Sequence, residues 1–133
     1  VRMQRHCDNT RLIAEYLNSN NKIEKVYWPG FTFHQNHEIA KEQMSDYGGM
    51  LSFELKGGKT KDAFKVLERL KLFTLAESLG GVESLSGHPA SMTHASIPKI
   101  EREKSGLSDS LIRLSVGIED SEDLINDLAQ AIS

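Results

Sequence analysis

The stretch GGMLSFELKGG, residues 48–58, decides the fold class. Its apolar residues Leu51, Phe53 and Leu55 alternate with polar ones, which is the two-residue period of a strand with one buried face. Glycine pairs bound the stretch at both ends and predict a break in regular structure at each. The pattern therefore predicts a half-buried strand, which needs a second layer of structure over its apolar face.

Helices are predicted on both sides of this strand. A helix over residues 1–18 is indicated by apolar and small residues at three- and four-residue steps, namely Met3, Cys7, Thr10, Ile13 and Leu17. A second, short helix is expected over residues 38–44. A third is expected to begin at Thr60 as its N-cap and to carry a stripe of Ala63, Phe64, Val66, Leu67 and Leu70.

Three further strands complete the predicted sheet, over residues 26–28, 72–76 and 111–116. In the last of them Arg113 lies on the opposite side from Ile112 and Leu114, so the strand presents a cation away from its aliphatic side. After Gly117, Asp120 is the expected cap of a final helix. We therefore predict an α+β fold, with an antiparallel sheet of about four strands covered by helices.

Composition restricts the functions that the chain can have. Its 133 residues predict a single domain over 1–133, and 16 basic against 19 acidic residues, with the basic ones scattered, argue against a nucleic-acid partner. No stretch approaches the roughly 20 apolar residues of a membrane span, so no membrane partner is expected. The single cysteine, Cys7, cannot form an internal disulfide, and a cytoplasmic location is predicted. On its apolar helix face Cys7 is expected to pack as a small hydrophobe.

Three motifs resemble chemical sites but are incomplete. HEIAK, residues 37–41, begins like a zinc-protease helix, but Lys41 replaces the second histidine. GKT, residues 58–60, resembles the end of a phosphate-binding loop whose first glycine would fall within the predicted strand. His34 with His37, or His88 with His94, could meet at an ion, but neither pair has a complete ligand set. No metal site is predicted.

The stretch ESLGGVES, residues 77–84, is a better candidate for a binding site. Two glycines follow a predicted strand there, and they allow backbone N–H groups to approach a ligand closely. A plain turn is the alternative. Arg113 offers a planar fork of donors that matches a carboxylate, so an arginine beside such a turn would make a carboxylate clamp.

These segments resemble the trans-sulfuration family of enzymes that depend on pyridoxal 5'-phosphate, above all cystathionine γ-synthase and cystathionine γ-lyase. The resemblance rests on the following stretches: RHC at 5–7, GGMLSF at 48–53, FTLAESLGGVESL at 73–85, HPASMTHAS at 88–96 and IRLSVGIED at 112–120. It thus covers nearly the whole chain.

The resemblance implies a C-terminal substrate-binding small domain of a fold-type I enzyme, with helix 1–18 linking it to a large domain that binds pyridoxal phosphate, in a homotetramer. Arg113 matches the arginine that binds the substrate α-carboxylate. Ser78 matches a residue that helps to hold the same carboxylate, Leu79 its neighbour, Glu77 a residue at the active-site entrance, and Thr93 a supporting position.

In that family the lysine that carries the cofactor, the phosphate-binding loop and the aromatic residue stacked on the cofactor all belong to the preceding domain. No catalytic residue is therefore expected in this chain, and turnover is expected only in a longer parent acting on a small amino acid. Glu77 favours the γ-synthase and γ-lyase branches, and the choice between them stays open. So does an alternative in which the chain is a stand-alone, non-catalytic amino-acid-binding or interaction module.

Overall fold

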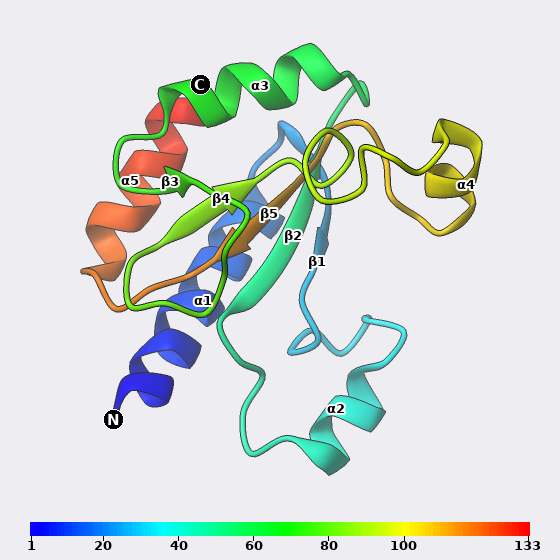
Figure 1. Cartoon of the computed structure of the whole chain (residues 1–133). Coiled ribbons are helices and arrows are strands. Elements are labelled where there is room, and N and C mark those ends of the chain that lie inside the picture. The colour runs from blue at the N-terminus through cyan, green and yellow to red at the C-terminus, as the bar shows by residue number, and fades with distance from the viewer.

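The computed structural model describes residues 1–133 and shows a sheet with helices on one face (Figure 1). The helices are α1 (Arg2–Ser19), α2 (His37–Gln43), α3 (Thr60–Arg69), α4 (Lys99–Lys104) and α5 (Ser121–Ile132). The strands are β1 (Ile23–Tyr27), β2 (Met50–Leu55), β3 (Thr74–Leu75), β4 (Leu85–Gly87) and β5 (Leu111–Ser115). The α+β prediction is confirmed.

The sheet has five strands in the order β1-β2-β5-β4-β3, where about four were predicted. All neighbours are antiparallel except β3 and β4, which run parallel. The strand that the sequence did not reveal is β4, whose three residues are all buried and therefore show no alternation of apolar and polar side chains. The sheet is thus mixed, although mostly antiparallel.

The core lies between the sheet and helices α1, α3 and α5. A cluster of 20 buried residues fills it, including Leu51, Phe53 and Leu55 of the stretch that decided the fold. Helices α1 and α5 contact each other, α1 also contacts β1 and β2, and α3 contacts α5. In Figure 1 the opposite face of the sheet carries no helix, and α2 and α4 project from the body.

Two details of the predicted helices were wrong. Thr60 is the first residue of α3 and not its cap, because Lys59 occupies the cap position and no side chain bonds to the free N–H groups there. Met3 and Phe64 were placed on buried stripes, but both are exposed, Met3 because it lies in the first turn of a helix that projects beyond the sheet. At α5, by contrast, Asp120 accepts from the N–H groups of Glu122 and Asp123 and caps the helix as predicted.

None of the helices has both the length and the apolar character that a membrane span requires. Cys7 is buried on the inner face of α1, in agreement with the packing role predicted for it.

Candidate active-site surface around Arg113

Arg113 lies at the centre of the open face of the sheet. The strand register places it between Ser52 of β2 on one side and Gly87 of β4 on the other, and Tyr27 of β1 follows Ser52 in the same row. Its neighbours in sequence, Ile112 and Leu114, are fully buried on the helix side. The alternation read from the sequence therefore gave the correct face for the arginine.

The glycine-rich segment and Arg113 are in contact, which sequence reasoning could not establish. Arg113 Nη2 donates to the backbone oxygens of Glu77 and Ser78, at 3.2 and 3.3 Å. These two bonds hold the guanidinium beside the loop that follows β3. The arginine and the turn thus form one surface.

A small, closed hollow lies beside the guanidinium, and it is too narrow to admit a molecule the size of water. Glu77, Thr93 and Arg113 line it together with Ala76, Gly87, His88, Pro89 and Met92. A methyl group added at Gly87 would lie 3.8 Å from Arg113 Nη2 and 3.4 Å from the Ala76 oxygen, both ordinary van der Waals contacts. The Arg113 guanidinium therefore lies close to Gly87 of β4.

The other predicted residues are placed less centrally. Ser78 contributes its backbone oxygen to Arg113, but it does not line the hollow. Leu79 is 54% exposed and is not among the lining residues either. Thr93 does line the hollow, with its hydroxyl 2.7 Å from His94 Nδ1. The structure therefore brings together Arg113, Glu77 and Thr93, with Ser78 adjacent.

The glycine turn is tied to the sheet by hydrogen bonds. The Gly80 N–H donates to Ser115 Oγ at 2.8 Å, so this donor is not free for a ligand as the sequence analysis supposed. Ser84 donates from its N–H and its hydroxyl to the two carboxylate oxygens of Glu119, and the Gly117 N–H donates to Ser84 Oγ. Ser84 and Glu119, whose role the sequence pattern did not reveal, hold the loop in place next to Arg113.

Arg113 has no acidic partner. The ion pairs of the chain join Arg11 to Asp46, Lys99 to Glu103 and Asp109, and Arg102 to Asp109. The hydrogen bonds of Arg113 go only to carbonyl oxygens, and these do not neutralise its charge. The partly exposed guanidinium also lines an open pocket of about 240 Å³, together with Tyr27, Met50, Leu51 and Ser52. There it suits a ligand carboxylate, which could take two parallel N–H bonds.

The surface does not fit pyridoxal phosphate by itself. A lysine is needed to carry that cofactor, and no lysine lines the hollow. The histidines are not arranged for a metal either, since both ring nitrogens of His88 and one of His37 bond within the protein. No group of three or more His, Cys, Asp or Glu residues could hold an ion.

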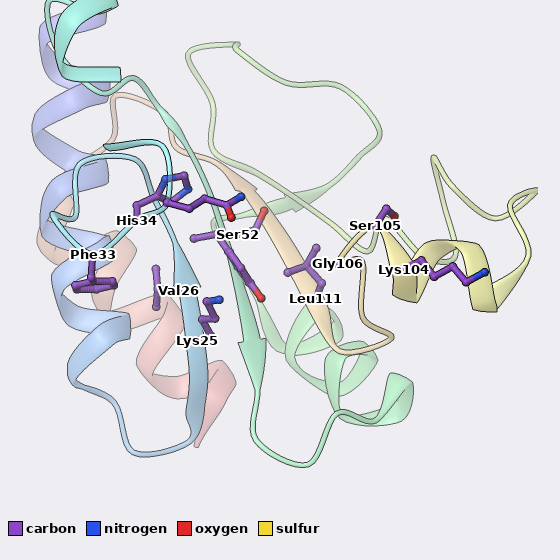
Figure 2. Close-up of a pocket in the computed structure, with 11 residues that line it drawn as sticks. Lys25, Val26, Phe33, His34, Ser52, Lys104, Ser105, Gly106 and Leu111 are labelled. Atoms are coloured by element: carbon purple, nitrogen blue, oxygen red, sulfur yellow. The ribbon is translucent and has the colours of Figure 1, made fainter. Parts of the chain in front are cut away.

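A larger pocket of about 560 Å³ lies elsewhere on the open face, and none of the predicted site residues lines it. It spans β1, the loop at Phe33 and His34, and the segment after α4 (Figure 2). Its two cations do not converge, since Figure 2 shows the Lys104 side chain extending away from the strand that carries Lys25. We see no arrangement there that recognises a particular ligand.

The fold is shared with enzymes of sulfur amino acids. Two solved structures of cystathionine gamma synthase from Xanthomonas oryzae pv. oryzae superpose on 98% of this chain, with TM-scores of 0.92 and 0.93 and 46% identity. One is in complex with cystathionine, the other with aminoacrylate and cysteine, and the match covers 34% of each of those chains.

A family model described as "Cys/Met metabolism PLP-dependent enzyme" matches residues 1–133, and the chain belongs to this family. Among its curated relatives, a cystathionine beta-lyase of Coxiella burnetii is 56% identical over 132 residues. An L-methionine gamma-lyase of Fusobacterium nucleatum and the cystathionine gamma-lyase of Bos taurus are each 54% identical. All three matches include 99% of this chain but only 34%, 33% and 32% of the relatives, so the chain spans about a third of their length.

Proposed function

We propose that this chain is the C-terminal, substrate-binding domain of a pyridoxal-phosphate-dependent trans-sulfuration enzyme, in which Arg113 binds the substrate α-carboxylate. The observation that carries the proposal is the position of the guanidinium, which lies on the open sheet face, lines a pocket of about 240 Å³ there and has no acidic partner. Family membership and the likeness to a cystathionine-bound synthase support it.

The residues of this chain would bind and orient the substrate. Arg113 would hold the carboxylate in a bidentate pair, and the loop oxygens of Glu77 and Ser78 would keep the guanidinium in place. Leu79, exposed on the same loop, would contact the amino acid, and Thr93, which lines the closed hollow with Arg113, would support the guanidinium. Fixing the carboxylate limits rotation of the Cα substituents, which is a positioning effect on the reaction.

The proposed parent would eliminate or replace the γ-substituent of an amino acid such as cystathionine or an O-activated homoserine. When bound, pyridoxal phosphate supplies the electron sink for this chemistry, and a large domain of the parent would hold it. The γ-synthase and γ-lyase branches are preferred because of Glu77. Relatives of nearly equal identity bear β-lyase, methionine γ-lyase and cystathionine γ-lyase names, so overall identity does not select a branch.

The test is Arg113→Ala in the full-length parent with L-cystathionine as substrate. Losing a charge-assisted bidentate bond, with a net worth of about 1.5–3 kcal/mol, should raise KM by about tenfold or more. Arg113→Lys should recover only part of the loss, because an ammonium cannot form the planar fork.

Arg5→Ala is the matched control. Arg5 also donates to two backbone oxygens of a loop, those of Ile118 and Glu119, but it does not line the hollow. Its replacement should leave KM near the wild-type value. If Arg113→Ala and Arg5→Ala gave the same KM as wild type in a folded parent, Arg113 would not be the carboxylate ligand.

A further inference from the structure

The chain leaves the sheet after Gly87, at the end of β4, and returns to it at Leu111, the start of β5. The excursion between them, residues 88–110, contains α4 and extends well beyond the strands (Figure 1). Its first part includes Met92 and Thr93, which line the hollow beside Arg113. What holds this excursion in place therefore also determines the shape of the hollow.

A single buried side chain closes the base of the excursion. His88 is 1% exposed, its Nε2 lies 2.7 Å from the Asp109 backbone oxygen, and its Nδ1 lies 2.7 Å from Ser91 Oγ. A carbonyl can only accept, so Nε2 carries the proton, and in the neutral ring Nδ1 then accepts from the Ser91 hydroxyl. His88 thus bridges the first turn of the excursion to its last residues.

Asp109, at one end of this bridge, is held in place by ion pairs. The Asp109 carboxylate pairs with Lys99 Nζ at 2.7 Å and with Arg102 Nη2 at 3.6 Å, which connects α4 to the return of the chain. Hydrogen bonding to Lys99 lowers the pKa of Asp109, so the carboxylate stays charged at neutral pH. Arg102 Nη1 also donates to the Ile97 oxygen at 2.7 Å. The partner of His88 is therefore held in a fixed position.

At the other end of the bridge, the backbone of His88 bonds to residues next to the hollow and on its lining. The His88 oxygen accepts from the N–H groups of Ser91 and Met92, and the His88 N–H donates to Met92 Sδ at 3.3 Å. His88 also follows Gly87, which pairs with Arg113 across the two strands. The turn that presents Met92 and Thr93 is thus formed around His88, one residue away from the row that contains the guanidinium.

We infer that His88 is a positioning residue for the Arg113 surface: by bridging Ser91 to Asp109 it holds Met92 and Thr93 in place around the closed hollow that they line together with the guanidinium. The inference rests on the proposed function. Because this hollow is too narrow for a water-sized molecule, Met92 and Thr93 limit where the guanidinium itself can lie, so loosening them should weaken substrate binding more than it changes the rate of the bound complex.

The experiment compares His88→Phe, His88→Gln and Ser91→Ala in the full-length parent, with L-cystathionine as substrate. Phenylalanine keeps the ring and its packing against Phe64 but loses both hydrogen bonds. It should raise KM by about five- to tenfold with a smaller change in kcat. Glutamine can still reach the Asp109 oxygen and should rescue part of the effect, and Ser91→Ala, at an exposed position where folding is not at risk, should show a smaller rise of the same kind.

His37→Gln is the matched control. His37 is also buried and bonds through its ring to a backbone oxygen, that of Pro29, but it begins α2, away from the hollow. A variant that only lowers stability should behave like His37→Gln, with a lower melting temperature and an unchanged KM. His88 variants that change only the melting temperature would overturn the inference.

A double variant separates this inference from the proposed function. If His88 acts through the Arg113 surface, His88→Phe should raise KM far less in an Arg113→Ala background than in the wild type. Equal effects in both backgrounds would overturn the positioning role while leaving the role of Arg113 intact. An unchanged KM in Arg113→Ala alone would instead refute the proposed function.

Discussion

Cys7 illustrates at the scale of a residue how burial controls chemistry. Burial raises the pKa of its thiol, with smaller contributions of the same sign from Asp46 and Asp8, and a backbone hydrogen bond from Gly48 opposes the shift. A raised pKa means less thiolate at neutral pH, so we expect Cys7 to react slowly with a thiol reagent such as DTNB in the native chain and rapidly in denaturant.

The native reaction should become faster as pH rises, because more of the thiol then ionises. Its rate at pH 7.5 is measured against a small free thiol under the same conditions. A native rate equal to that of the free thiol would show that α1 does not stay packed against the sheet, which contradicts the burial of Cys7 described above.

Arg113 shows what sequence could and could not predict about the site. Its face was predictable, because alternation along β5 decides on which side of the sheet each side chain lies. Its contacts with the loop oxygens at residues 77 and 78 were not, since they join positions 35 and 36 residues apart and depend on where β3 and β4 enter the sheet. The bridge made by His88 was hidden for the same reason, because its partner Asp109 lies 21 residues away.

At the scale of an element, Asp127 of α5 binds the segment that connects α3 to β3. It is a buried residue of α5, and its carboxylate accepts from three consecutive backbone N–H groups, those of Lys71, Leu72 and Phe73, at 2.9, 2.8 and 3.2 Å. The chain between α3 and β3 is thereby attached to α5. Asp127→Asn loses the charge and places an NH2 group near these donors, which should lower the free energy of unfolding by about 1–3 kcal/mol.

Urea denaturation of the two folded chains measures the difference. Asp8→Asn, at an exposed position of α1 beyond its first turn, is the control and should change stability by less than about 0.5 kcal/mol. Equal midpoints for Asp127→Asn and wild type would show that the three hydrogen bonds add nothing to stability.

The elements that sequence predicted well are those with a clear period. Strand β2 alternates along its whole length, and α5 combines an acidic cap with a regular apolar stripe. Helix α4 was not predicted because none of its residues is buried, so no apolar face marks it. Its position depends instead on the ion pairs of Asp109 with Lys99 and Arg102, which no local pattern reveals.

At the scale of the whole molecule, the proposed recognition surface lies on the open face of the sheet, and the buried core lies on the covered face. The twenty-residue cluster lies beneath the helices, whereas Tyr27, Ser52 and Arg113 form a row on the other side. The relatives are about three times longer than this chain. Under the proposed function, this domain would orient the substrate and the rest of the parent would bind the cofactor.

This division predicts the result of adding pyridoxal phosphate to the isolated chain, once circular dichroism has shown the chain to be folded. No lysine lines the hollow, so the chain should form no stoichiometric adduct that borohydride can reduce at a single lysine. Excess cofactor should modify surface lysines at low and scattered occupancy, which peptide mass spectrometry would resolve. One fully modified lysine would mean that the chain itself contains a cofactor site, and would favour a self-sufficient module over a domain that depends on its parent.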